Sequence, residues 1–304
     1  MSASLPDSKK TPVPAVNPAS LFYARGPVQR VLRGLFAGLQ RLSPALAGAA
    51  AMQLFRTPLP PRWAGSAAAW PAVWQRHSLP FEGGQLRFWR RGAADAGHRP
   101  AVLLLHGWGG RAQDMAALAE RLWQAGFAPL LPDLPAHGRS SGWRSDMPQW
   151  LRAIQALSAA HGPWHAVVGH SLGALAAAHS VAAGLPAQRL VLLAVSPPPR
   201  QILHWFAAGF GLRAGVQQHM AAWFAQRGAA LERFEPAWLG SRLVLPTLLL
   251  HDEADRAAPL AHALAMQQQL PTGRMQLTQG LGHRRLLRDE AVLEAVRRHL
   301  GDAA

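Results

Sequence analysis

From about residue 76, the chain alternates between short apolar runs and segments with helical periodicity. Continuous apolar runs separated by helices are typical of an α/β fold, in which helices cover both faces of a mainly parallel central sheet. The first two runs are close together and less apolar, so we expect an antiparallel hairpin at one edge. The predicted strands are residues 76–79, 86–90, 101–105, 128–131, 164–168, 190–195, 247–251 and 275–278, and the predicted helices are 112–125, 148–160, 174–183, 259–269 and 289–300.

The alternation stops at about residues 199–243, where helix-like segments follow one another with no strand between them. We predict a helical insertion that covers the ends of the strands as a cap. Most of its large apolar side chains are expected to pack together, and some of them to line an acyl pocket. They are Leu203, Trp205, Phe206, Phe210, Met220, Trp223, Phe224, Phe234 and Trp238.

The part of the chain before this pattern divides in two. Residues 1–19 carry four prolines and no periodicity, which predicts a disordered tail. Residues 20–75 are predicted to form a helical N-terminal extension, and Ser43-Pro44 ends its first helix or begins another. Apolar residues recur at helical spacing in that first helix, at Val28, Val31, Leu32, Leu35, Phe36, Leu39 and Leu42, with Arg30, Arg33 and Arg41 off or beside the stripe.

This basic amphipathic helix has two interpretations. The favoured one is that it packs its apolar stripe on the main domain; the alternative is peripheral contact with a membrane surface. The uncharged stretch at residues 42–55 is shorter than the roughly 20 residues that span a bilayer. No apolar core follows the basic start of the chain, so a secretory signal is not predicted and a cytoplasmic location is expected.

Composition excludes several classes of site. The 304 residues suit one domain with an insertion or an extension. The net charge of +15 is carried mostly by arginines spread along the chain, without a dense basic cluster interleaved with aromatics, so a nucleic-acid partner is not favoured. The absence of cysteine rules out disulfides, thiolate metal sites and a cysteine nucleophile.

The segment Gly169-His170-Ser171-Leu172-Gly173 lies between a predicted strand and a predicted helix. This arrangement predicts a sharp turn with a serine at its apex, since glycines lack the Cβ atoms that would clash in so tight a turn. Ser171 is therefore the candidate nucleophile.

A serine hydroxyl needs a base, and the base needs an orienting acid. His283 follows the last predicted strand in a glycine-flanked loop, and Asp255 follows the strand before it. Loops after parallel strands meet at one edge of the sheet, so these side chains are expected to converge on Ser171. Asp252 remains an alternative to Asp255, which is favoured because it lies further into its loop.

Acyl transfer also needs N–H groups at the developing oxyanion. The segment His106-Gly107-Trp108-Gly109-Gly110 follows a predicted strand and can offer the Trp108 N–H opposite that of Leu172. The same segment matches the dinucleotide pattern G-x-G-x-x-G/A, with Asp133 as the ribose-binding acid. That alternative leaves the serine turn, Asp255 and His283 unexplained, so a hydrolase is favoured.

Together these motifs resemble the α/β-hydrolase family over residues 76–304. The resemblance rests on His106-Gly107, the segment from Asp133 to Ser140, the turn at Ser171, Asp255 and Gly282-His283. It implies no cofactor, Ser171 as nucleophile, His283 as base, Asp255 as orienting acid and the N–H groups of Trp108 and Leu172 as oxyanion hole.

The sequence thus predicts a serine hydrolase of the esterase, lipase or thioesterase kind, acting on a small and apolar acyl substrate. An acyltransferase that uses the same triad is the nearest alternative. A non-catalytic binding protein on the same fold is an alternative of another class.

Overall fold

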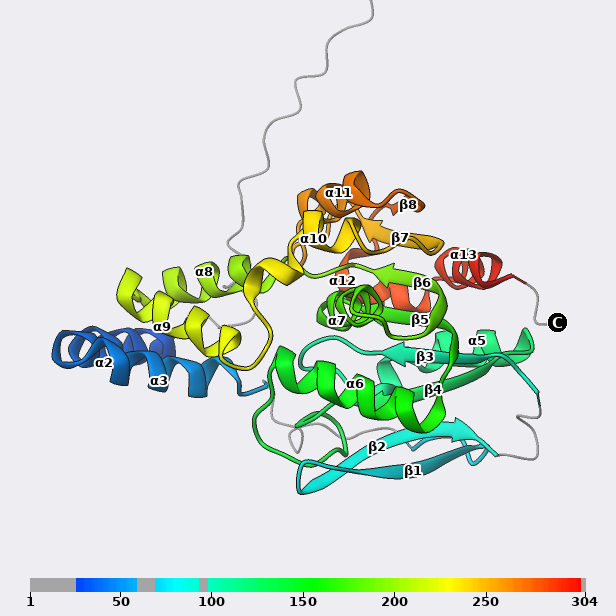
Figure 1. Ribbon diagram of the computed structural model, residues 1–304, viewed down its shortest axis with the longest axis horizontal. Helices are drawn as coiled ribbons and strands as arrows, with labels where there is room; N and C mark the ends of the chain where they lie inside the picture. Colours follow the sequence, from blue (N-terminus) through cyan, green and yellow to red (C-terminus); the bar gives the residue numbers. More distant parts are fainter. Residues whose placement is uncertain (1–25, 59–68, 93–97, 302–304) are drawn as a thin grey trace, which may run out of the picture.

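The computed structural model describes residues 26–58, 69–92 and 98–301, so the predicted tail at residues 1–19 lies outside the described residues. An eight-stranded sheet in the order β1-β2-β4-β3-β5-β6-β7-β8 forms its centre (Figure 1). β1 pairs with β2 and β2 with β4 in antiparallel fashion, whereas the other pairs are parallel. The predicted sheet with an edge hairpin is confirmed. The strands are β1 Trp74–Phe81, β2 Gly84–Arg91, β3 Ala101–Leu105, β4 Ala128–Asp133, β5 Trp164–His170, β6 Ala187–Leu193, β7 Thr247–Asp252 and β8 Gly273–Thr278.

Helices cover both faces of the sheet because its central strands are apolar on both sides. Leu103 and Leu105 of β3 belong to one buried cluster, with side chains of α6, α7 and α11. Val102 and Leu104 of the same strand belong to a second cluster, with α5 and α13. The covering elements are η1 Ala112–Met115, α5 Ala116–Gln124, α6 Met147–His161, α7 Leu172–Ala182, α11 Leu260–Gln269, α12 Gly282–Arg285, η3 Leu286–Arg288 and α13 Glu290–Leu300.

Between β6 and β7 the chain forms helices only, at the position of the predicted insertion. They are α8 Pro199–Phe210, α9 Ala214–Ala225, η2 Leu231–Phe234 and α10 Pro236–Gly240. Two earlier helices, α2 Pro27–Leu42 and α3 Pro44–Phe55, lie beside α8 and α9 at one end of the molecule, to the left in Figure 1. Ser43 separates α2 from α3, and its side chain accepts a hydrogen bond from the Leu46 N–H as the N-cap of α3.

A buried amide joins α2 to the cap. Gln40 donates from Nε2 to the Gly211 carbonyl over 3.0 Å and accepts the Arg213 N–H over 2.9 Å, so both its polar ends are satisfied at the turn between α8 and α9. Phe36 packs beside it on Phe210, with ring centroids 5.9 Å apart. The N-terminal helices are therefore packed on the cap rather than on the sheet.

Part of the apolar stripe of α2 packs on the cap and part is exposed, so the favoured interpretation of this helix holds only in part. Phe36 is buried against the cap, but Val28, Val31, Leu35 and Leu42 are 62–85% exposed. Helical periodicity identified an amphipathic helix, and only part of the apolar set meets a neighbour. Within the described residues, no helix is both long enough and apolar enough to cross a bilayer.

Candidate active site

Ser171 lies at the sharp turn between β5 and α7, with φ +56° and ψ −121°. A Cβ on Gly169 would lie 2.4 Å from the Gly173 carbonyl oxygen, and a Cβ on Gly173 would lie 2.3 Å from the His106 carbonyl oxygen. No real side chain tolerates such contacts, so the turn needs glycine at both positions. It holds a non-glycine residue at positive φ at its apex, a conformation that persists only where the surroundings enforce it.

The structure brings Ser171, His283 and Asp255 together in one hydrogen-bonded chain. The Ser171 Oγ lies 2.9 Å from His283 Nε2, and His283 Nδ1 lies 2.7 Å from Asp255 Oδ2. With Asp255 ionised, Nδ1–H donates to the carboxylate, and Nε2 is free to accept the Ser171 hydroxyl proton. The arrangement can remove a proton from Ser171 and return it to another atom nearby.

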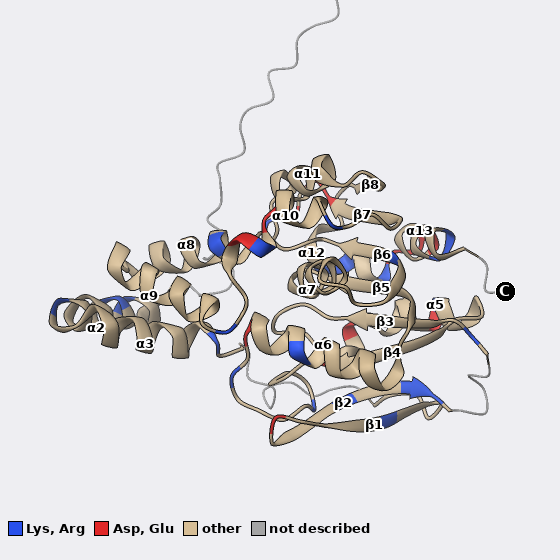
Figure 2. Cartoon of the chain, viewed as in Figure 1, with Lys and Arg blue, Asp and Glu red and all other residues tan. Residues whose placement is uncertain are grey.

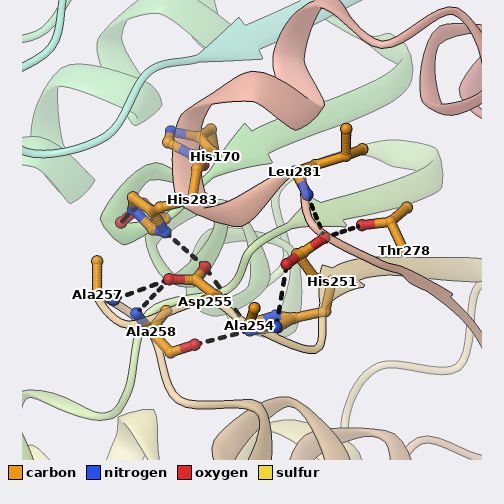
Figure 3. Close-up of polar contacts among 11 residues, drawn as sticks. His170, His251, Ala254, Asp255, Ala257, Ala258, Thr278, Leu281 and His283 are labelled. Carbon is orange, nitrogen blue, oxygen red and sulfur yellow. Dashed lines mark hydrogen bonds and ion pairs between the residues drawn. The ribbon is translucent and has the colours of Figure 1, made fainter. Parts of the chain in front are cut away.

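The carboxylate of Asp255 is fixed from both sides (Figure 3). Its Oδ1 accepts the N–H groups of Ala257 and Ala258 over 2.8 and 2.9 Å, while Oδ2 faces His283. Burial raises the pKa of Asp255, but the hydrogen bond and charge of His283 and the Ala258 N–H outweigh this, so the net pKa is lowered. The ionised form is thus the one that this site stabilises.

Asp252, the alternative acid, has a different set of partners. Its Oδ2 accepts the Thr278 hydroxyl over 2.9 Å and the Leu281 N–H over 2.8 Å, which ties β7 to the loop that carries His283. The structure therefore places Asp255 at the imidazole and leaves Asp252 to hold the loop.

A buried histidine supports the same loop from the other side. His170, next to Ser171, has its Nε2 2.8 Å from the His283 carbonyl oxygen, and the two rings lie 4.7 Å apart. Burial, together with the nearby His283, lowers the pKa of His170 to about 3. His170 is therefore neutral and donates its N–H to the backbone of His283.

The N–H groups predicted to bind an oxyanion lie at the same place. Leu172 is the first residue of α7, where an N–H has no partner within the helix. The Trp108 N–H has no acceptor among the residues described. Both residues line one cavity with Ser171.

The Asp133 side chain holds two loops together. Its Oδ1 accepts the Ala112 N–H and its Oδ2 the Arg139 N–H, each over 2.7 Å, and the side chain is buried. These bonds fasten the loop after β3 to the loop after β4. Because this carboxylate is buried and bonds the backbone through both oxygens, it is not exposed to a ligand, which argues against the ribose contact of the dinucleotide alternative.

The cavity above Ser171 is mainly apolar, and it draws on three separate parts of the chain. Phe55, at the end of α3, contributes to it together with Ile202 and Trp205 of α8 and Phe224 of α9. Trp205 and Phe224 were among the aromatics of the predicted cap, whereas no sequence signal pointed to Phe55. The remaining lining residues are Trp108, Ser145, Asp146, Met147, Ser171, Leu172, Ser196, Pro197, Pro199 and Ala257.

Comparisons with known proteins agree with this fold. Residues 96–211 match the family described as serine aminopeptidase, S33, and residues 221–304 match the family described as TAP-like protein. An esterase of Pyrococcus furiosus has the same fold, with a TM-score of 0.60 and 17% identity over 81% of this chain and 96% of that one. The chain belongs to the α/β-hydrolase fold family. The first of the matched regions holds Ser171, and the second holds Asp255 and His283.

Two curated relatives of this α/β-hydrolase share one name with each other. A pimeloyl-[acyl-carrier protein] methyl ester esterase of Xanthomonas axonopodis pv. citri is 38% identical over 154 residues, which cover 50% of this chain and 55% of the relative. The protein of that name from Pectobacterium atrosepticum is 31% identical over 173 residues, or 56% and 62% of the two chains. This chain therefore spans little more than half the length of the curated relatives that it matches.

Proposed function

We propose that this α/β-hydrolase is a serine esterase or thioesterase that forms an acyl intermediate on Ser171. The observation that carries the proposal is the hydrogen-bonded chain from Ser171 through His283 to the buried Asp255. A hydroxyl paired with an oriented imidazole is the arrangement that acyl transfer to serine requires.

In the first half of the reaction, Ser171 Oγ attacks the acyl carbon while His283 Nε2 takes the hydroxyl proton. The N–H groups of Trp108 and Leu172 bind the oxyanion that forms, and each such donor is typically worth about 2.7–4 kcal/mol of barrier. His283 then gives its proton to the departing oxygen or sulfur as that bond breaks. Water repeats the sequence on the acyl-serine and releases the acid, and Asp255 keeps the imidazole oriented throughout.

The cavity favours an apolar acyl group. Its walls combine the aromatic rings of Phe55, Trp205 and Phe224 with Ile202, and they contain few polar side chains. The curated relatives named as methyl ester esterases support ester hydrolysis. We infer one catalytic domain at residues 76–304, with the cap at about 199–243 and an N-terminal extension whose Phe55 completes the cavity. A cytoplasmic location stays a prediction.

Product analysis separates hydrolysis from its alternatives. The protein is mixed with p-nitrophenyl octanoate, and the acyl-enzyme is sought by mass spectrometry after rapid acid quench. We expect a mass increase of one octanoyl group on the peptide that contains Ser171, and octanoic acid as the product. An ester formed with added alcohols in preference to the acid would favour an acyltransferase, and a folded protein that neither reacts nor acylates would favour a binding protein.

A second proposal concerns the exposed part of α2. We propose that Val28, Val31, Leu35 and Leu42 contact an anionic membrane surface. All four are exposed, and α2 carries Arg30, Arg33 and Arg41 but no acidic residue, while α3 has no charge at all (Figure 2). Apolar residues beside arginines are the combination that binds a negatively charged lipid surface.

Vesicle flotation tests this contact. We expect the protein to float with vesicles containing one third phosphatidylglycerol, and Leu35→Asp to abolish this. Val244→Asp is the matched control, because Val244 is 72% exposed and lies away from α2. Unchanged flotation of Leu35→Asp would contradict the proposal. The wild type could instead fail to float and form a dimer in solution that Leu35→Asp converts to a monomer. That result would show that the exposed face of α2 contacts a second copy of the chain and not a membrane.

A further inference from the structure

Ser171 lies between two different openings. Besides the apolar cavity, a second cleft reaches the serine from the side of His283, and the two share only Trp108 and Ser171. The second cleft is lined by Arg284 and Arg285 of α12 and by Arg288 of η3. The sequence carries a signal for this cleft outside the motifs described above, because Arg284 and Arg285 follow His283 directly and Arg288 lies three residues further on.

The position of His283 assigns one part of the substrate to each opening. His283 lines the second cleft and is absent from the lining of the apolar cavity. If His283 acts as in the proposed function, its proton goes to the leaving atom, which must lie within hydrogen-bond distance of Nε2. The leaving group therefore occupies the second cleft, and the acyl chain occupies the apolar cavity.

The charge of the second cleft is strongly positive. All three arginines are exposed, and within the described residues no carboxylate lies at ion-pair distance from any of them. Arg285 bonds the carbonyls of Gly280 and Leu281, which fixes the position of its guanidinium. The one acid in the lining, Asp114, accepts the Arg111 N–H over 3.0 Å. The lining of this cleft therefore contains three guanidinium groups and one carboxylate, and that carboxylate already accepts a backbone N–H.

We propose that this arginine cleft, formed by Arg284, Arg285 and Arg288, binds the phosphate of a phosphate-bearing leaving group. The inference rests on the proposed function and narrows its substrate class to acyl esters or thioesters of a phosphorylated alcohol or thiol. Guanidinium groups bind phosphate oxygens through paired, charge-assisted hydrogen bonds. In the step concerned, the Ser171 Oγ–acyl bond forms, the acyl–oxygen or acyl–sulfur bond breaks, and the proton from Ser171 passes through His283 to the departing atom.

Three octanoyl substrates test this assignment. Octanoyl-coenzyme A and 1-octanoyl-glycerol 3-phosphate carry phosphate on the leaving group, whereas p-nitrophenyl octanoate carries none. We expect Arg284→Glu/Arg288→Glu to lower the ratio of kcat/KM for a phosphate substrate to that for p-nitrophenyl octanoate by about tenfold or more, through a higher KM. A fall of the ratio for octanoyl-coenzyme A identifies the leaving group as a phosphorylated thiol. A fall for 1-octanoyl-glycerol 3-phosphate identifies it as a phosphorylated alcohol.

A matched control removes the same charge elsewhere. Arg76 of β1 and Arg274 of β8 are exposed on the two edge strands, and Arg76→Glu/Arg274→Glu should leave the ratio unchanged. Arg288→Gln, which is further from His283 in sequence, should lower the ratio to a smaller degree. A native Tm verifies that each variant is folded.

Two results would overturn the proposal while leaving the proposed function intact: an equal loss on all three substrates, or an equal fall of the ratio in the edge-strand control. A wild-type protein that is folded but neither labels at Ser171 nor hydrolyses any of the three would remove the proposed function, and the leaving-group site with it.

Discussion

Phe55, at the end of α3, packs edge-to-face on Phe206 of the cap helix α8, with ring centroids 5.2 Å apart and an interplanar angle of 86°. Phe55 also lines the cavity above Ser171, so a helix outside the hydrolase domain forms part of the proposed acyl site. The length of acyl chain that fits depends on this side chain.

Shortening Phe55 should therefore favour longer substrates. In Phe55→Leu we expect the ratio of kcat/KM for the dodecanoate to that for the octanoate p-nitrophenyl ester to rise by about tenfold. The smaller side chain should let about two more methylenes of the longer chain become buried, at about 0.8 kcal/mol each. Val73→Ala, an exposed position at the sheet edge, is the control. An unchanged ratio in a variant with native Tm would exclude Phe55 from the acyl site.

Asp252, the last residue of β7, and Asp255, in the loop that follows, should respond differently to amidation. Asp255→Asn removes the acceptor that orients His283, and we expect kcat to fall by about 10³- to 10⁴-fold with little change in Tm. Asp252→Asn weakens the contacts to Thr278 and Leu281, so a fall in Tm with less than about tenfold loss of kcat is expected. The opposite ranking of kcat would identify Asp252 as the orienting acid.

An ion pair fastens the N-terminal extension to the hydrolase domain. Arg56 Nε lies 2.9 Å from Asp146 Oδ2, and the Asp146 side chain, which also caps α6 through the Gln149 N–H, is only 4% exposed. Asp146→Ala loses both the cap and the pair, and should cost about 3 kcal/mol of unfolding free energy. Arg56→Ala should cost about 1–2 kcal/mol. Urea unfolding of both single variants and the double variant measures the coupling, and strictly additive losses would contradict a direct interaction.

Mild acid should destabilise the fold. Burial lowers the pKa of His106 to about 4, and burial with a neighbouring histidine lowers those of His137 and His170 to about 3. The unfolded chain binds these protons near pH 6.5, so stability is lost as the pH falls below that value. Burial raises the pKa of Asp133 to about 6, which acts in the opposite direction.

Between pH 7.5 and 5.5, these three histidines together should lower the free energy of unfolding by about 4 kcal/mol and Asp133 should restore about 1 kcal/mol, so the four groups together contribute a loss of about 3 kcal/mol. Urea unfolding at the two pH values measures this. Equal stability at both would mean that the histidines are not neutral in the folded protein.

The sheet was predictable from sequence because its signal is local. Each apolar run, such as Val102 to Leu105, is buried on both faces and keeps its character whatever the loops do. The serine turn was equally local, since Gly169 and Gly173 are dictated by backbone contacts within the turn and with the neighbouring strand.

What sequence could not decide depends on how distant segments meet. Asp255 accepts the N–H groups of its own loop, whereas Asp252 accepts the Leu281 N–H of the loop that carries His283. The spacing of the two aspartates along the sequence does not predict these partners. Periodicity identified α2 as amphipathic but did not tell which of its apolar residues would contact the cap. Leu35 and Phe36 both belong to the apolar stripe, yet Leu35 is exposed and Phe36 is buried. Phe55 reaches the cavity only because α3 packs on α9.

The central claim is that Ser171 is a nucleophile activated by His283. Its most direct measurement is the rate of covalent labelling by a fluorophosphonate probe in the folded protein at neutral pH. We expect rapid labelling of one site in the wild type, none in Ser171→Ala, and a rate lower by at least about 10³-fold in His283→Ala. Labelling that persists in Ser171→Ala, or a folded wild type that does not label, would contradict the claim.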